Sequence, residues 1–214
     1  MNRRIFALAG VAIFIAPTFA VGQPTERSVD ANRVFANLLD YYRLPAADRT
    51  RFHPAYRLRP ETGATVSVSL LSGGVRRPLD LGPDGRVLNP PTAAELQNDA
   101  QVIVSSAARM SSGVTLEPTL LLATTMAAAD AVAAINQANV AIGRFAGALG
   151  LFAPRVRGVS FTASASAAAA ALLSDGRRTS LFYRNEVFEF RPADARGASQ
   201  LIFSVAPSSA AFME

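Results

Sequence analysis

The chain has 214 residues, of which 50% are hydrophobic and 17% charged, so it can bury a core and is not disordered throughout. It contains no cysteine and a single histidine, which excludes disulfides, thiolate nucleophiles and any metal site that needs cysteines or several histidines from one chain. The formal net charge is +5, all of the basic residues are arginine, and the charge falls to +3 without the two arginines at positions 3 and 4. This mild surplus does not support nucleic-acid binding.

The N-terminus has the pattern of a cleaved export signal. Arg3 and Arg4 precede an apolar run over residues 5–16, and small residues then allow cleavage before Val21 or Gln23. The run is shorter than the roughly 20 apolar residues of a membrane-spanning helix. We therefore expect a signal peptide over 1–22, export to the periplasm or the medium, and no membrane span after cleavage.

The mature chain is predicted to begin with one helix over residues 28–44. Ser28 or Asp30 can cap its start, and Pro45 ends it. Five apolar side chains recur at helical spacing on one side and predict its buried face: Val34, Phe35, Leu38, Leu39 and Tyr42.

Strands and turns are predicted over the rest of the first half. Residues 65–71 alternate strictly, and glycines at 73–74 and within 82–85 predict turns. The other elements expected here are an extended segment over 52–60, a short capped helix or turn from 89–96, and strands over 101–106 and 116–122.

A long helix over residues 125–149 is predicted to open the second half. Its apolar seam consists of Ala128, Val132, Ile135, Asn139, Ile142, Ala146 and Leu149, among many alanines. The seam can pack on the protein's own sheet, which we favour, or on a second molecule.

From Arg157 onward the hydrophobic period changes from helical spacing to two. Asp175 and Gly176 predict a tight hairpin. Strands over 179–183, 186–191 and 200–205 are expected to form a meander, with Phe188 and Phe190 on one face.

These elements predict an α+β fold, in which antiparallel sheets pack against a long alanine-rich helix and a shorter N-terminal helix. We expect one domain over 23–214. A helix followed by strands occurs in both halves, which leaves open a division into subregions 23–122 and 123–214.

Several short segments carry a family resemblance. Residues 34–42, 66–70, 78–81, 116–118 and 152–161 occur in an order that resembles an uncharacterised family of proteobacterial exported proteins. The resemblance implies a periplasmic protein, and it implies no activity.

No convincing catalytic set is apparent. His53, with Asp48 near it in sequence and many serines, could form a nucleophile–base–acid set, but Phe52 and Pro54 enclose it and it has no nucleophile-elbow motif. A structural or exposed histidine is the simpler interpretation. The acidic residues near 80–84 and 186–189 are typical of turns, so we predict no catalytic residue, no metal site and no cofactor.

Arginines two residues apart are the recurring feature of this chain. On a strand, such residues share a face, so Arg57 with Arg59 and Arg155 with Arg157 could form forks that bind phosphate or carboxylate groups. The simpler alternative is a solvated or edge-protecting charged face, since no lysine is available for that role.

The sequence therefore predicts a non-enzymatic periplasmic binding or envelope-interaction protein. Its expected partner is an anionic envelope component or a periplasmic protein, with no nucleic acid, and its oligomeric state is left open. The alternative is a periplasmic hydrolase acting on cell-wall or lipid substrates.

Overall fold

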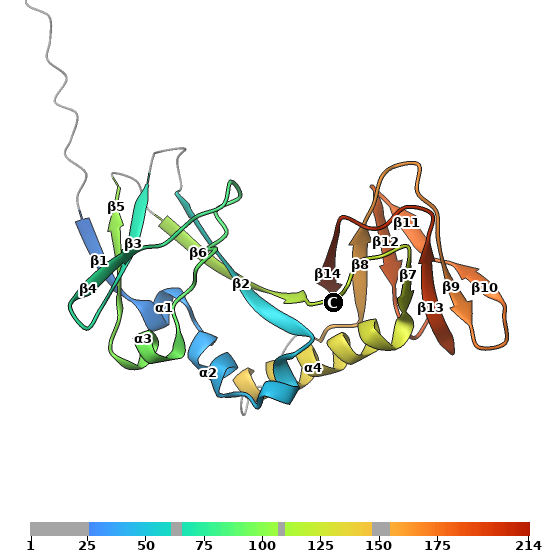
Figure 1. The fold of residues 1–214 in the computed structure, drawn as a ribbon, viewed down its shortest axis with the longest axis horizontal. Coiled ribbons are helices and arrows are strands. Elements are labelled where there is room, and N and C mark those ends of the chain that lie inside the picture. Colours follow the sequence, from blue (N-terminus) through green and yellow to red (C-terminus); the bar gives the residue numbers. More distant parts are fainter. Residues whose placement is uncertain (1–25, 61–65, 107–109, 147–154) are drawn as a thin grey trace, which may run out of the picture.

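The computed structural model describes residues 26–60, 66–106, 110–146 and 155–214. The predicted signal peptide, 1–22, lies outside the described residues. Two lobes rich in antiparallel strands lie at opposite ends of the molecule, and a long two-stranded ribbon and one long helix run between them (Figure 1). The predicted α+β class, with antiparallel sheets and one long helix, is confirmed.

The first lobe is built on a four-stranded sheet in the order β1-β5-β3-β4, in which all pairs are antiparallel. Side chains from three short helices pack on this sheet, where Phe35, Leu38 and Leu96 are buried with residues of β3 and β5. The strands are β1 (Glu26–Asp30), β3 (Ser67–Ser72), β4 (Val75–Pro78) and β5 (Gln101–Ser105). The helical elements are α1 (Ala31–Val34), α2 (Leu38–Arg43), the 3-10 turn η1 (Ala46–Arg49) and α3 (Ala93–Gln97).

The single helix predicted over 28–44 is wrong. Ser28 lies in β1 opposite Ile103, and the helix begins only after Asp30, whose carboxylate accepts the backbone N–H of Asn32 at 2.8 Å. The first helical segment ends at Val34 with Phe35 as its C-cap, and Asn37, in a left-handed conformation with φ +64°, precedes the start of α2. The apolar spacing nevertheless predicted buried side chains correctly at two positions: Phe35 and Leu38 are almost completely buried.

The ribbon consists of β2 (Phe52–Pro60) and β6 (Met110–Pro118), paired antiparallel along all nine residues. The extended segment predicted over 52–60 is confirmed. The strand predicted over 116–122 instead ends at Pro118, which has no backbone N–H with which to continue a ladder.

The long helix, α4, spans Ala128–Ala146, so it begins three residues later than predicted, and positions 147–149 of the prediction lie outside the described residues. Residues Thr125–Ala127 form a strand, β7, that pairs with the second lobe. Asp130 in the first turn and Arg144 in the last turn complement the helix dipole. Position 149 of the predicted seam lies outside the described residues.

The buried face of α4 is rotated from the predicted seam. Val132, Asn139 and Ile142 of the predicted seam are only half-buried. The residues between α4 and the sheets are mostly alanines, because small side chains let the helix lie close to the sheets. The fully buried residues are Ala128, Ala131, Ala134, Ile135, Ala138 and Ala141. The face packs within the chain, as favoured from the sequence.

The second lobe contains two antiparallel four-stranded sheets, ordered β10-β9-β13-β7 and β11-β12-β8-β14. The segment 179–183 is not one strand, because Leu181 breaks it and the two halves enter different sheets, so the predicted single meander is wrong. The Asp175–Gly176 turn joins β9 to β10 as predicted. The strands are β8 (Gly158–Thr162), β9 (Ala169–Leu173), β10 (Arg178–Ser180), β11 (Phe182–Arg184), β12 (Val187–Phe190), β13 (Ala198–Phe203) and β14 (Ser209–Met213).

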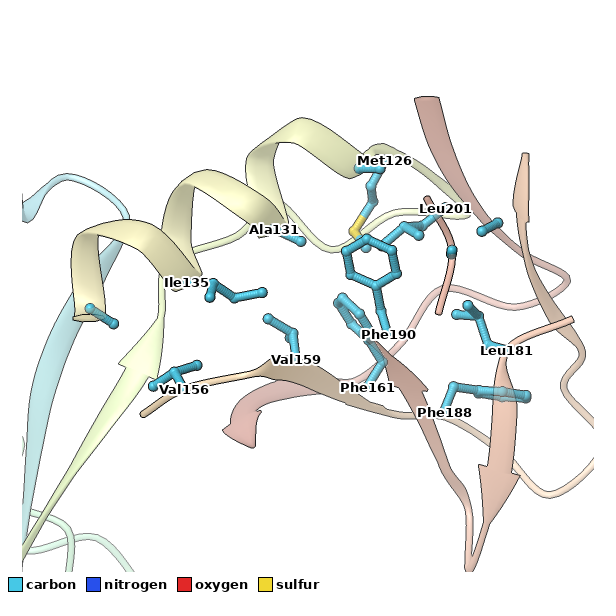
Figure 2. Close-up of a cluster of buried hydrophobic side chains, with 14 of the residues drawn as sticks. Met126, Ala131, Ile135, Val156, Val159, Phe161, Leu181, Phe188, Phe190 and Leu201 are labelled. Carbon is cyan, nitrogen blue, oxygen red and sulfur yellow. The ribbon is translucent and has the colours of Figure 1, made fainter. Parts of the chain in front are cut away.

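Aromatic side chains from these sheets form the core beneath α4 (Figure 2). Phe161 on β8 lies opposite Phe188 on β12, and its ring meets that of Phe203 edge-on at 5.2 Å. Phe188 and Phe190 are both buried on the same face, as predicted. Ile135 of α4 extends toward this cluster (Figure 2).

Three polar side chains of α4 hold the start of the ribbon. Asp130 pairs with Arg51 at 2.9 Å and Arg144 with Asp48 at 3.0 Å. Midway between them, Gln137 accepts the backbone N–H of Arg51 and donates to the carbonyl of Ala47. Because these three residues are seven apart, they share one face of the helix and fix η1 and β2 against it.

Among the described residues, no helix is long and apolar enough to cross a membrane.

Candidate functional site

A short segment, residues 85–87, pairs antiparallel with β2 of the ribbon. Leu58 donates its backbone N–H to Gly85 at 2.8 Å, and Val87 donates to the carbonyl of Tyr56 at 2.9 Å. Gly85 has φ +78°, and a Cβ there would lie 2.5 Å from the Leu58 oxygen. Only glycine fits this approach, which places Arg86 beside β2.

Four side chains meet on this part of the ribbon, and we call them the ribbon cluster: His53, Arg57, Arg86 and Glu117. Glu117 is central, since its two carboxylate oxygens accept from Arg57 Nη2 at 3.0 Å and from Arg86 Nη1 at 2.6 Å. His53 lies opposite Glu117 in the β2–β6 register, and its Nε2 is 3.0 Å from Arg86 Nη2. Arg57 also pairs with Asp84 at 3.0 Å, so two carboxylates balance the charges of the two arginines.

The pKa values in the ribbon cluster follow from these contacts. Burial alone would raise the pKa of Glu117, but hydrogen bonds from Arg57 and Arg86 outweigh it and the pKa lies below its ordinary value. Burial lowers the pKa of His53, and the charge of Arg86 lowers it further against the opposing effect of Glu117. His53 is thus neutral at pH 7.

The partners of His53 also decide its tautomer. A guanidinium can only donate, so Nε2 accepts from Arg86 and the proton sits on Nδ1, which donates to Thr119 Oγ1 at 3.1 Å. A general base would need the reverse, with the imidazole accepting the hydroxyl proton. His53 in this arrangement does not activate Thr119, and Asp48, its predicted acidic partner, pairs with Arg144 instead.

The environment of His53 predicts a pH effect on stability. Because the folded pKa lies below that of the unfolded chain, the unfolded state takes up protons first as the pH falls through about 6.5. We expect the free energy of unfolding to fall from pH 7.0 to 5.5 by more in the wild type than in His53→Gln. The difference should be small, since the side chain is 41% exposed. Urea titrations of both proteins at the two pH values measure it, and equal losses of stability in the two proteins would contradict this environment.

The first predicted arginine fork is only partly available to a ligand. Arg57 and Arg59 do share a face, since both contact Asp84: Arg57 Nε donates to Oδ2 at 3.0 Å and Arg59 Nε to the backbone oxygen at 3.1 Å. The remaining nitrogens of Arg57 donate to Thr115 and Glu117. The terminal nitrogens of Arg59 make no hydrogen bond within the described part of the chain.

The second predicted fork does not lie on a strand, because residues 155–157 precede β8, which begins at Gly158. Arg155 and Arg157 are exposed on either side of buried Val156, whose backbone is held by the side chain of Asn139 on α4 at 2.9 Å. Among described residues, neither guanidinium makes an ion pair or hydrogen bond. The backbone is fixed at Val156 and at Arg157, whose N–H donates to the carbonyl of Met213 at 2.7 Å.

An apolar groove of about 520 Å³ lies where the ribbon, the end of α4 and β14 come together. Val156 lines it, so the two free arginines flank a residue of its wall. Tyr41 and Tyr56 also line it, but their hydroxyls donate to the carbonyls of Phe52 and Ala36. The other lining residues are Ala36, Asn37, Pro54, Val114, Thr115, Leu116, Ile142, Phe145, Ala146, Phe212, Met213 and Glu214.

The remaining acidic candidates have structural roles. Glu189 pairs with Arg191 at 2.9 Å, and Glu186 occupies a turn with φ +64°. Asp84 accepts the backbone N–H of Arg86 within the 82–85 turn. Within the described ranges, no group of three or more potential metal-ligating side chains occurs.

Sequence reasoning found His53 and Arg57 but missed Arg86 and Glu117. Their positions depend on the β2–β6 register and on the 85–87 segment, neither of which has a local signal.

Comparisons of the chain with protein-family models, curated proteins and solved structures return no match.

Proposed function

We propose that the protein is a non-enzymatic binding protein that is exported to the periplasm or the medium and attaches to an anionic component of the cell envelope. The basic start and apolar run within residues 1–22 support export, because this pattern is typical of a cleaved signal. The resemblance to proteobacterial exported proteins is consistent with the same location.

The observation that carries the proposal is the open arginine fork. Arg155 and Arg157 each present a planar guanidinium that can donate two parallel hydrogen bonds to a phosphate or carboxylate. Asn139 holds the backbone of Val156 between them, so binding need not order this segment first. Arg59, near the end of β2, is a separate candidate whose Nε donates to the backbone of Asp84, and Arg57 contributes least because Glu117 and Asp84 already hold it.

The alternative, a hydrolase of cell-wall or lipid substrates, has less support. Its base would have to be His53, whose Nε2 accepts from Arg86 and whose Nδ1 donates to Thr119. His53 also does not line the apolar groove. The polar groups that a hydrolase would need in one pocket are therefore engaged elsewhere.

Co-sedimentation with lipid vesicles tests the proposal. The purified protein should bind phosphatidylglycerol vesicles at low ionic strength and not phosphatidylcholine vesicles. Each arginine near an anionic membrane contributes about 1 kcal/mol, so replacing Arg155 and Arg157 with serine should weaken binding about 30-fold.

The matched control replaces Arg178 and Arg184 with serine. Both are exposed, both lack an ion pair within the described residues, and the loss of charge is the same. This control should bind nearly as well as the wild type. Equal weakening in the two double variants would indicate a diffuse charge effect and contradict the fork, as would undiminished binding by the Arg155/Arg157 variant.

A further inference from the structure

A separate pocket of about 440 Å³ lies in the second lobe, where the chain crosses from one sheet to the other. One side of the pocket is the segment that ends β10 and begins β11, and the other side is the end of β12 with the turn that follows it. Two of the lining residues, Leu181 and Ala195, are buried. The volume lies within the range of pockets that bind small molecules.

Four charged side chains line this pocket, two of each sign: Arg184, Arg191, Glu189 and Asp194. Arg191 Nη2 donates to Glu189 Oε2 at 2.9 Å, so these two residues balance each other. Within the described parts of the chain, the side chains of Arg184 and Asp194 form no hydrogen bond or ion pair, either together or with another group. A cation and an anion therefore border one pocket without neutralising each other.

The two unpaired charges favour a ligand that carries both signs. A ligand with only a carboxylate could pair with Arg184, but it would also lie near the negative charge of Asp194. A ligand with only an ammonium group would have the opposite conflict. In a zwitterion, the carboxylate can accept hydrogen bonds from Arg184 while the ammonium group donates to Asp194, so each charge meets its complement.

The pocket also offers apolar surface next to these charges. Phe182 and Arg184 are two residues apart on β11 and share one side of the strand, on which Phe182 lies opposite Glu189 in the β11–β12 register. Phe182 lines the pocket and is 61% exposed. An apolar group of the ligand that covers this ring would remove apolar surface on both partners from water.

We propose that this pocket binds a free α-amino acid with an apolar side chain, whose carboxylate pairs with Arg184 and whose ammonium group pairs with Asp194. The side chain of the ligand packs on Phe182. Neither Arg155 nor Arg157 lines this pocket, so the inference goes beyond the proposed function and does not depend on it.

An NMR titration of the protein with L-phenylalanine and two analogues of the same aromatic body tests this proposal. Backbone amide signals of residues 179–184 and 189–195 should shift with L-phenylalanine, with a dissociation constant of about 1 mM or tighter. Phenylpropionate lacks the ammonium group and phenethylamine lacks the carboxylate. Each should bind at least about tenfold more weakly, because it leaves one charged group of the pocket without a partner.

Two results of this titration would overturn the proposal. If either analogue binds as tightly as L-phenylalanine, the pocket does not recognise a zwitterion. If L-phenylalanine shifts none of these signals at about ten times the expected dissociation constant, the pocket does not bind amino acids.

Asp194→Asn tests the partner of the ammonium group. The variant keeps the shape of the side chain and removes its charge, so it should weaken binding of L-phenylalanine at least about tenfold and should not weaken binding of phenylpropionate. Asp99→Asn is the matched control, because Asp99 is also exposed, does not line the pocket and loses the same charge. Equal binding of L-phenylalanine by the two variants would contradict the role of Asp194.

Arg184→Gln tests the partner of the carboxylate in the same way. It should weaken binding of L-phenylalanine at least about tenfold and leave binding of phenethylamine unchanged. Arg178→Gln is its control, since Arg178 is exposed and does not line the pocket. If Arg184→Gln binds L-phenylalanine as the control does, the assignment of the carboxylate is wrong, and the vesicle assay of the Arg155/Arg157 variant is unaffected by that result.

Discussion

Replacing Phe161 with alanine is expected to lower the free energy of unfolding by about 3–5 kcal/mol, more than any other substitution that we propose. Phe161 has no exposed surface, and its ring contacts Phe203 edge-on at 5.2 Å within the core beneath α4. The truncation removes buried apolar surface and leaves a cavity that the paired strands on both sides of β8 cannot close. Urea unfolding followed by circular dichroism measures the loss.

Phe182→Ala is the control for this substitution. Phe182 is 61% exposed at the edge strand β11, so its truncation should change the free energy of unfolding by less than about 0.5 kcal/mol. Similar losses in the two variants would show that Phe161 is not in a packed core.

Glu95→Gln is expected to destabilise the protein by about 1–3 kcal/mol at pH 7, the second largest effect. Glu95 accepts two hydrogen bonds from Arg77, at 2.7 and 3.0 Å, and completes a capping box with Thr92 at the start of α3. Arg77 also donates to the carbonyls of Asn89 and Pro90, so the pair joins β4 to the loop that leads into α3. Loss of the carboxylate charge leaves this arginine only partly compensated.

The pH dependence provides the sharper test of this pair. The hydrogen bonds from Arg77 lower the pKa of Glu95 to about 2, against the opposing effect of burial, whereas the unfolded chain titrates near 4.5. The stabilisation is therefore complete above pH 4.5 and is lost as the pH falls toward 2. Wild type and Glu95→Gln should differ most in stability at pH 7 and converge by pH 2.

Glu26→Gln is the matched control, because Glu26 pairs with Arg76 at 2.9 Å but is 56% exposed. Its replacement should cost less than about 1 kcal/mol. If the stability difference between wild type and Glu95→Gln is the same at pH 7 and pH 2, the carboxylate is not held as described.

Local signals predicted much of the fold. The proline and glycines at 82–85 form the expected turn, and Asp175 with Gly176 forms the expected hairpin, because each fixes a backbone conformation without help from distant residues. The capped helix after Pro91 likewise follows from Thr92 and Glu95, which lie three residues apart. Alternation over 65–71 predicted β3 for the same reason.

The sequence predictions were wrong where contacts between distant residues override the local conformational preference. Asn37 is compatible with a continuous helix, and only the packing of Phe35 and Leu38 into one core selects its left-handed conformation. In α4 the larger side chains predicted a seam, but close approach to the sheets selects the alanine face instead. Neither choice has a signature within a short window of sequence.

The candidate site could be predicted only in part for the same reason. The spacing of two residues between arginines identified both pairs. It could not show that Arg57 forms an ion pair with Glu117, whereas Arg155 and Arg157 form none with the described residues. That distinction depends on which strand pairs with β2 and in which register. The groove likewise combines residues from 36 to 214, so no stretch of sequence predicts it.

Hydrogen–deuterium exchange on lipid vesicles would locate the binding surface most directly. On phosphatidylglycerol vesicles we predict slower exchange, relative to phosphatidylcholine, in peptides covering residues 155–158 around the two arginines. Peptides over 178–184, which carry the control arginines, should exchange alike on both. Protection confined to 178–184, with 155–158 unchanged, would contradict the assignment of the anion-binding surface.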